Sequence, residues 1–88
     1  MKREKVYKLI DDERDYQDDK WGMDKENSVE AWLVYIEDYL NAAKHSVSRS
    51  TNIISYELAK CNIRKIAAMA VCAMEQHDIM SREQEEQE

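Results

Sequence analysis

Proline is absent from this chain of 88 residues, and glycine occurs once, as Gly22. Both residue types interrupt helices, so their scarcity leaves few points at which a helix must stop. Apolar residues recur at helical spacing rather than in the alternating pattern of a strand. We therefore expect an all-α fold of three helices, with one domain over residues 1–80 and an acidic, disordered tail over 81–88.

Basic residues are few relative to acidic ones, 13 against 19, which gives a formal net charge of −6. This balance argues against binding to the phosphate backbone of nucleic acids. The longest uninterrupted apolar run, 66–74, is far shorter than the roughly 20 residues of a membrane span. No apolar signal segment follows Met1, and the two cysteines, Cys61 and Cys72, stand too far apart on one helix to form a bridge. We expect a cytoplasmic protein with neither nucleic acid nor membrane as its partner.

Apolar spacing and capping residues predict where the helices lie. The first covers about 3–19 and ends before Gly22. The second follows a cap at Asn27 or Ser28, with Glu30 placed for a capping box on Asn27, and ends in a region rich in Ser and Thr at 46–52. The third runs from about residue 53 to 78, with Ile54 and Leu58 on its inner side. The second and third helices form a hairpin.

The third helix contains a stretch, 66–74, that has no polar residue and that a single neighbouring hairpin cannot cover on every side. Small residues within it, such as Ala67 and Ala70, allow a second chain to approach closely. A chain of this length also buries only a thin core. We therefore expect a homodimer or higher homo-oligomer that completes a helical bundle.

The end of the first helix holds candidate ligand-binding residues. Glu13, Gln17 and Lys20 lie at i, i+4 and i+7, along one side of a helix. The apolar stripe of this helix continues into Glu13 and Gln17, which predicts that both point into the bundle. Trp21 stands next to Gly22 at the helix end, where its ring can stack on a base. A solvated, charged helix that stops at a glycine would show the same spacing.

The second and third helices carry a second polar group. Glu37 and Asp38 are adjacent, and Glu57 can face them across an antiparallel hairpin. Carboxylates on facing helices are how bundles hold Mg²⁺, although ordinary surface charges would show the same pattern. Lys60 and Arg64 follow Glu57 at i+3 and i+7, so they either pair along the helix or hold a phosphate by charge-assisted hydrogen bonds.

Three stretches together carry a resemblance to a known family: Glu13-Arg14-x-x-Gln17-x-x-Lys20-Trp21-Gly22, then Trp32-Leu33-x-x-Ile36-Glu37, then Ile66-Ala67-Ala68-Met69-Ala70-Val71 with Glu75-Gln76-His77. Over about residues 5–78 the chain resembles the small, phage-type MazG-like proteins, which are similar to the all-α nucleoside triphosphate pyrophosphohydrolases. Active members hold Mg²⁺ with a Glu-x-x-Glu pair on one helix and a Glu-x-x-Asp pair on the next. They cleave between the α and β phosphates.

The resemblance maps the first pair onto Glu37 or Asp38 and onto Asn41, and the second pair onto Glu57 and Lys60. An amide and an ammonium thus stand where the family has carboxylates, which weakens a site for a hard cation. The resemblance implies that Glu37, Asp38 and Glu57 are the catalytic and metal-binding residues wherever hydrolysis occurs. The ammonium of Lys60 could instead replace the charge of the metal.

Another alignment places Asn62 where Glu57 is assigned above, and this register supplies even fewer carboxylates. In either register we expect a MazG-like nucleotide-binding protein with weak or absent Mg²⁺-dependent (d)NTP pyrophosphohydrolase activity. The alternative is a phage accessory or anti-defence protein that binds a host protein or sequesters a nucleotide messenger. The residues expected to bind the ligand are Glu13, Gln17, Lys20, Trp21, Lys60 and Arg64.

Overall fold

The computed structural model describes residues 1–22, 26–49 and 52–87, with the side chain of residue 49 left out. Within these ranges the chain forms α-helices and no strand, as predicted. The helices are α1 (Arg3–Trp21), α2 (Val29–Arg49), α3 (Ile53–Gln76) and α4 (Arg82–Glu86). None of the helices in the described ranges combines the length and the apolar content of a transmembrane span.

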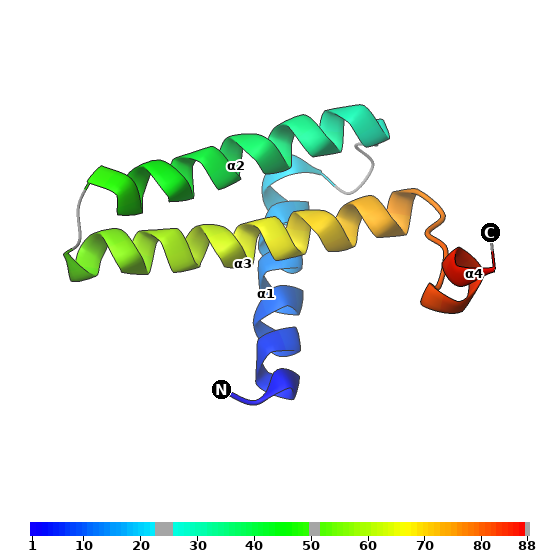
Figure 1. The fold of residues 1–88 in the computed structure, drawn as a ribbon, viewed down its shortest axis with the longest axis horizontal. Coiled ribbons are helices and arrows are strands. Elements are labelled where there is room, and N and C mark those ends of the chain that lie inside the picture. The colour runs from blue at the N-terminus through cyan, green and yellow to red at the C-terminus, as the bar shows by residue number, and fades with distance from the viewer. Residues whose placement is uncertain (23–25, 50–51, 88) are drawn as a thin grey trace.

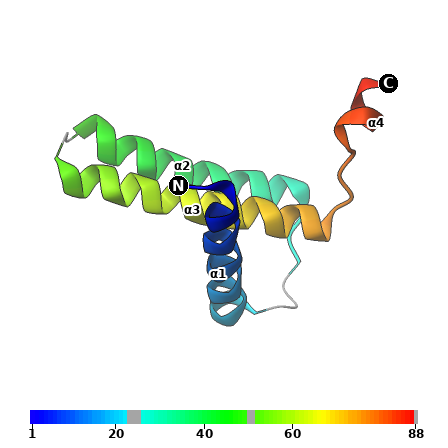
Figure 2. The same ribbon diagram turned by 90° about the horizontal axis from the view of Figure 1, so that it is seen from below.

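The helices α2 and α3 lie side by side as an antiparallel hairpin, and α1 crosses this hairpin steeply (Figures 1 and 2). Within the described chain, α1 and α2 each pack against α3 but not against each other. The buried apolar residues of this arrangement are Trp32, Ala43, Ala68 and Met69. The third helix is therefore the centre of the fold, and the site described below lies where α1 meets it.

Local sequence explains the helix ends. Gly22 follows α1 with a φ of +88°, a conformation that L side chains rarely adopt, and its N–H donates to the carbonyl of Asp18 over 2.9 Å. Ser28 caps α2, because its hydroxyl accepts from the N–H of Ala31 over 3.1 Å. Asn52 caps α3 in the same way, accepting from Ser55. The expected capping box on Asn27 is not formed, since the cap lies one residue later.

The second helix is longer than the sequence predicts. Instead of breaking near Ser46 it continues to Arg49. The hydroxyl of Ser46 donates to the carbonyl of Ala42, and that of Ser48 donates to the carbonyl of His45, each over 3.1 Å. Serines that bond back to the preceding turn can be accommodated within a helix, so a Ser-rich segment did not require a break here. The predicted connector at 22–26 falls largely outside the described residues.

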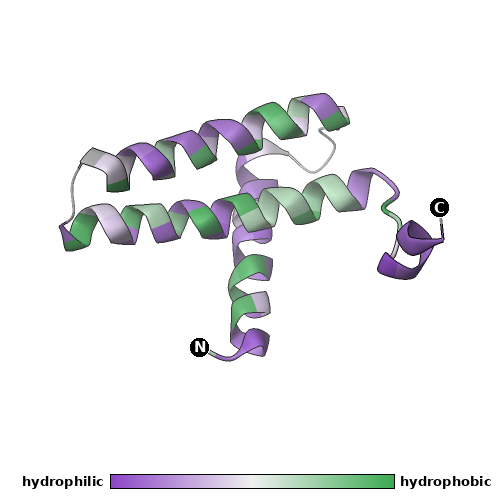
Figure 3. Cartoon of the chain, in the orientation of Figure 1, coloured by the Kyte–Doolittle hydropathy of each residue, from purple (hydrophilic) through white to green (hydrophobic). Residues whose placement is uncertain are grey.

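The inner side predicted for α3 is buried only along part of the helix. Met69 is 1% exposed, whereas Ile54 and Leu58 remain 69% and 56% exposed. The reason is where α1 crosses: its side chains reach Arg64, the carbonyl of Lys65 and Glu75, and it leaves the opposite end of the hairpin uncovered. The apolar stretch 66–74 is accordingly the best-covered part of α3, and it forms the broad green segment in Figure 3.

The tail differs from the sequence expectation in one respect. Residues 82–86 form the short helix α4, which begins with a capping box between Ser81 and Gln84. Within the described chain, α4 packs against none of the other helices. Figure 3 shows it as uniformly hydrophilic. A local cap therefore accounts for this helix without tertiary support.

Candidate functional site

Two polar side chains of α1 are buried against α3. Glu13 is 8% exposed and Gln17 is 2% exposed, so both point inward as their place in the apolar stripe predicts. The carboxylate of Glu13 accepts from Nε of Arg64 over 2.9 Å. The amide nitrogen of Gln17 donates to the backbone carbonyl of Lys65 over 3.3 Å. These bonds attach α1 to one turn of α3.

Gln17 has one group without a partner. Because the carbonyl of Lys65 can only accept, the amide of Gln17 must turn its nitrogen toward it and its oxygen away. Among the described residues no donor reaches this Oε1, which is buried. A buried acceptor without a donor is rare, and the residue that carries it lines both of the hollows described next.

The first hollow, named here the basic pocket, has a volume of about 330 Å³. It is bordered by residues of all three long helices: Glu13, Tyr16, Gln17, Lys20, Trp21, Tyr39, Arg64 and Lys65. Every ligand-binding residue expected from the sequence is among them except Lys60, which is exposed and paired with Glu57 over 2.8 Å. Sequence reasoning missed Lys65, and its position one residue after Arg64 was the available signal.

Positive charge is concentrated at this pocket. Lys20, Arg64 and Lys65 border it, while Glu13 is the one acidic wall residue among those that the structure describes. The ammonium of Lys20 lies 5.8 Å from the ring centre of Tyr16, within cation–π range. The hydrogen bond that Arg64 donates to Glu13 raises the pKa of Arg64 above its already high ordinary value, so this guanidinium stays charged. In a chain of net charge −6, a pocket with an excess of cations suits an anion.

The second hollow, named here the aromatic cavity, has a volume of about 240 Å³. Four rings line it, those of Trp21, Trp32, Tyr35 and Tyr39. The rings of Trp32 and Tyr35 meet edge to face, with centres 6.4 Å apart. Its other lining residues are Arg14, Gln17, Asp18, Gly22, Asn27, Met69 and Cys72.

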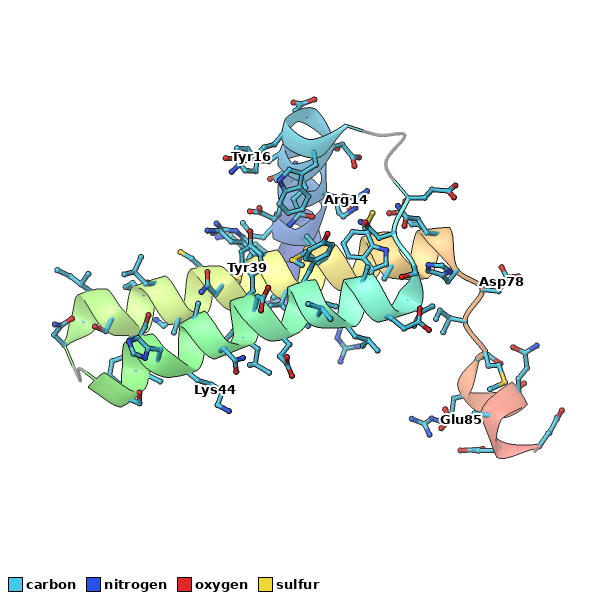
Figure 4. All side chains as sticks on the ribbon, turned by 90° about the horizontal axis from the view of Figure 1, so that it is seen from above. Arg14, Tyr16, Tyr39, Lys44, Asp78 and Glu85 are labelled. Atoms are coloured by element: carbon cyan, nitrogen blue, oxygen red, sulfur yellow. The ribbon has the colours of Figure 1, made fainter. Side chains whose placement is uncertain are left out.

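The two hollows are neighbours, because Gln17, Trp21 and Tyr39 border both, and together they are named here the cleft. Figure 4 shows Tyr39 of α2 pointing toward α1, whereas Lys44 of the same helix points away from it. The cleft therefore has an aromatic chamber and a cationic chamber, with Gln17 in the wall between them. Sequence reasoning identified α1 as one wall, and the structure adds Tyr35 and Tyr39 of α2 as a second.

A polar clamp fixes the rim of the aromatic cavity. The side-chain oxygen of Gln76 accepts from Nε1 of Trp32 over 2.8 Å and from the N–H of Asn27 over 3.1 Å. Nε2 of His77 donates to the carbonyl of Asn27 over 2.8 Å. The end of α3 thus holds Asn27, just before α2, in place. It also engages the indole N–H of Trp32, so this donor is not available to a ligand in the cavity.

The structure does not bring the expected metal ligands together. Asn62 donates to the carbonyl of Tyr39 over 3.5 Å, which sets the register of the hairpin. Glu57 lies on one side of this point and Glu37 on the other, roughly 10 Å apart along the hairpin at 1.5 Å per residue. Glu37 and its neighbour Asp38 are exposed. Across the part of the chain that the structure describes, no three His, Cys, Asp or Glu side chains are grouped to hold a metal ion.

The observed register places Asn62, rather than Glu57, beside the residues that follow Glu37. A hard cation such as Mg²⁺ needs several oxygen ligands at 2.0–2.1 Å, and separated carboxylates do not supply them. Glu37, Asp38 and Glu57, as the structure places them, therefore do not fit a magnesium site.

Comparisons with protein-family models, with curated proteins and with solved structures found no match to this chain. The resemblance to MazG-like proteins thus stays a prediction from motifs. What the chain binds has to be argued from the geometry of the cleft itself.

Proposed function

We propose that this protein binds a nucleotide in the cleft, with the base in the aromatic cavity and the phosphates in the basic pocket. The observation that carries the proposal is the adjacency of the two chambers across Gln17. Aromatic rings stack on bases, and cationic side chains bind phosphate by charge-assisted hydrogen bonds. The combined volume suits a ligand of nucleotide size.

Phosphate charge in this proposal is balanced by side chains. Lys20, Lys65 and Arg64 border the pocket. Arg64 donates its Nε–H to Glu13, and one of its terminal nitrogens lies 3.9 Å from the Sγ of Cys61. Such a site needs no divalent cation for binding. It agrees with the expectation of a MazG-like nucleotide-binding protein whose Mg²⁺-dependent (d)NTP pyrophosphohydrolase activity is weak or absent.

The binding proposal is tested by isothermal titration with a panel of nucleoside mono- and triphosphates in EDTA. We expect a Kd in the micromolar range for at least one of them, and weaker binding of about tenfold or more in a Lys20→Ala, Lys65→Ala double variant. Lys44→Ala is the control for loss of a cation, since Lys44 is exposed and points away from α1 (Figure 4). Absence of heat across the panel would refute the proposal.

The hydrolytic part of the proposal has a separate test. Any Mg²⁺-dependent release of pyrophosphate should be slow, and it should fall further in a Glu37→Ala, Glu57→Ala double variant if these carboxylates recruit the ion. Equal rates in the wild type and the double variant would remove Glu37 and Glu57 from catalysis. Binding in EDTA would not be affected by that result.

We also propose that, besides a nucleotide, the chain binds another copy of itself. The accessible surface is 7243 Å², whereas a compact monomer of this mass exposes about 5,400 Å². The Cα radius of gyration is 14.9 Å, against about 12 Å for a compact domain of this length. The excess area is of the size that a stable homodimer buries.

A host protein is the alternative occupant of the exposed apolar surface. Leu33, Val34 and Leu40 of α2 are 62%, 55% and 47% exposed, which is the observation that favours a protein partner. In this case the chain would act as a phage accessory protein, either by binding the host factor or by sequestering a nucleotide messenger in the cleft. A mass measurement of the purified chain tests the homodimer, because a chain that stays monomeric leaves all of its exposed apolar surface free for a host protein.

A further inference from the structure

The unpartnered oxygen of Gln17 constrains the chemistry of the base. Its amide is fixed at one end by the bond from its nitrogen to the carbonyl of Lys65, so Oε1 cannot exchange places with the nitrogen without losing that bond. The side chain is 2% exposed and lies in the wall between the two chambers. A ligand that enters one of these hollows and reaches this wall would supply the missing donor.

A second hydrogen-bond acceptor, besides Gln17 Oε1, borders the aromatic cavity. Asp18 borders the aromatic cavity, and its carboxylate accepts from Arg14 over 2.9 Å while retaining further acceptor capacity. Two donors near the cavity are engaged: the indole N–H of Trp32 is bonded to Gln76, and Arg14 is bonded to both Asp18 and Glu75. On the part of the wall that Gln17 and Asp18 form, the free hydrogen-bonding capacity consists mainly of acceptors.

Nucleobases differ in the hydrogen-bond donors and acceptors that they present to such a wall. Adenine and cytosine present an amino group with two N–H donors, and guanine presents an amino group next to a ring N–H. Uracil and thymine present one ring N–H between two carbonyl oxygens, and these oxygens would face the acceptors of the protein. A buried acceptor that meets another acceptor is penalised, and polar sites reject analogues that lack the matching group.

We propose that the cleft selects nucleotides whose base carries an exocyclic amino group, with Gln17 Oε1 and the carboxylate of Asp18 accepting from the base. This inference rests on the proposed nucleotide binding and adds the class of base. Gln17 and Asp18 are binding residues in it, while Lys65 positions the amide of Gln17 through its backbone carbonyl.

The test uses ligand pairs in which an amino group is exchanged for an oxo group and the adjacent ring nitrogen gains a hydrogen: dCMP against dUMP, and dAMP against dIMP, titrated in EDTA. We expect the amino member of each pair to bind about tenfold more tightly or better. In Gln17→Met, which keeps a similar volume but lacks the amide, the preference should fall to within about threefold. Lys44→Ala should keep the wild-type preference.

If Gln17→Met does not fold, Asp18→Asn tests the role of this wall instead. Asp18 is only partly buried, so its substitution is expected to preserve the fold. It replaces an acceptor oxygen with a donor nitrogen, so the preference for the amino member should shrink or reverse. Equal binding of both members by the wild type would overturn the inference while leaving nucleotide binding in place. A preference that survives both substitutions would overturn the assignment to this wall. No binding of any ligand would overturn the inference together with the proposed function.

Discussion

Glu13 and Arg64 illustrate how much the surroundings of an ion pair decide its contribution. Both this pair and Lys60–Glu57 join a cation to a carboxylate at 2.8–2.9 Å, but the Glu13 side chain is 8% exposed and that of Glu57 is 62% exposed. An exposed pair contributes little, because water solvates its members equally well when they are apart. A buried carboxylate that loses its partner stays desolvated without compensation.

We therefore predict that Arg64→Ala lowers the free energy of unfolding by about 1–3 kcal/mol. Lys60→Ala, the matched control on the same helix, should change it by less than about 0.5 kcal/mol. Urea denaturation of the two variants under identical conditions measures both values. Equal losses would mean that Glu13 is as well solvated as Glu57.

Cys72, in the wall of the aromatic cavity, makes stability dependent on pH. Burial raises the pKa of its thiol, an effect that nearby Arg14 partly offsets. Above the ordinary thiol value of about 8.5, the unfolded chain releases this proton while the folded chain still holds it. The contribution of Cys72 is therefore complete below that pH and is lost as the pH rises through the folded value.

The measurement is urea denaturation at pH 7.5 and at pH 9.5. We expect the wild type to lose more stability between these two values than Cys72→Ala does. Cys61→Ala, which removes the other thiol of α3, should behave like the wild type. A Cys72→Ala variant whose stability falls as steeply as that of the wild type would contradict the prediction.

At the scale of elements, the end of α1 depends on a single backbone conformation. Gly22 has a φ of +88°, and a Cβ built on it would meet nothing within 4 Å. Any cost of Gly22→Ala thus comes from backbone strain rather than from a clash, and we expect a loss of about 1–3 kcal/mol in unfolding free energy. Glu26→Ala, at an exposed position in the same connection, is the control and should be close to neutral.

In contrast to Gly22, the short helix α4 is expected to contribute nothing to the stability of the domain. It packs against none of the other described helices, and its capping box is local. Removal of residues 81–88 should leave the midpoint of thermal unfolding unchanged within about 1 °C, because no tertiary contact is lost. A clear fall in the midpoint, measured by circular dichroism, would show that the tail supports the domain.

At the scale of the whole molecule, the exposed half of α1 is where a second copy is expected to pack. Val6 and Leu9 share the face that buries Glu13 and Gln17 further along the helix, yet each is 38% exposed because α1 extends past α3 (Figure 1). A helix face that is apolar along its length is stable only when it is covered along its length.

We predict a mass of about twice the chain mass of 10.4 kDa in sedimentation equilibrium at micromolar concentration. Leu9→Asp should weaken the association at least tenfold and lower the unfolding midpoint, since it places a charge in the proposed contact. Lys44→Ala changes the net charge by the same amount elsewhere and should leave the mass unchanged. A monomeric wild type would refute the homodimer.

Much of the fold follows from local pattern. The start of α1, its stop at Gly22, the hairpin of α2 and α3, and the inward direction of Glu13 and Gln17 all follow from apolar spacing and capping residues. Local pattern also predicted a break at Ser46 where the helix continues, because serine hydroxyls can bond back within a helix as well as interrupt it. It placed Ile54 and Leu58 inside, because periodicity shows which side of a helix is apolar but not how far along a neighbour covers it.

The candidate site also has features that the sequence determines and features that it does not. The sequence by itself determined the polar residues that α1 presents, since a continuous stripe decides which way Glu13 and Gln17 point. Only the tertiary structure decided what they meet, because the crossing point of α1 and the register of the hairpin depend on contacts between segments far apart in the chain. That register brought Lys65 and Tyr39 to the cleft and left Lys60 outside it. It also separated Glu37 from Glu57, since each lies on its own side of the point where Asn62 meets Tyr39.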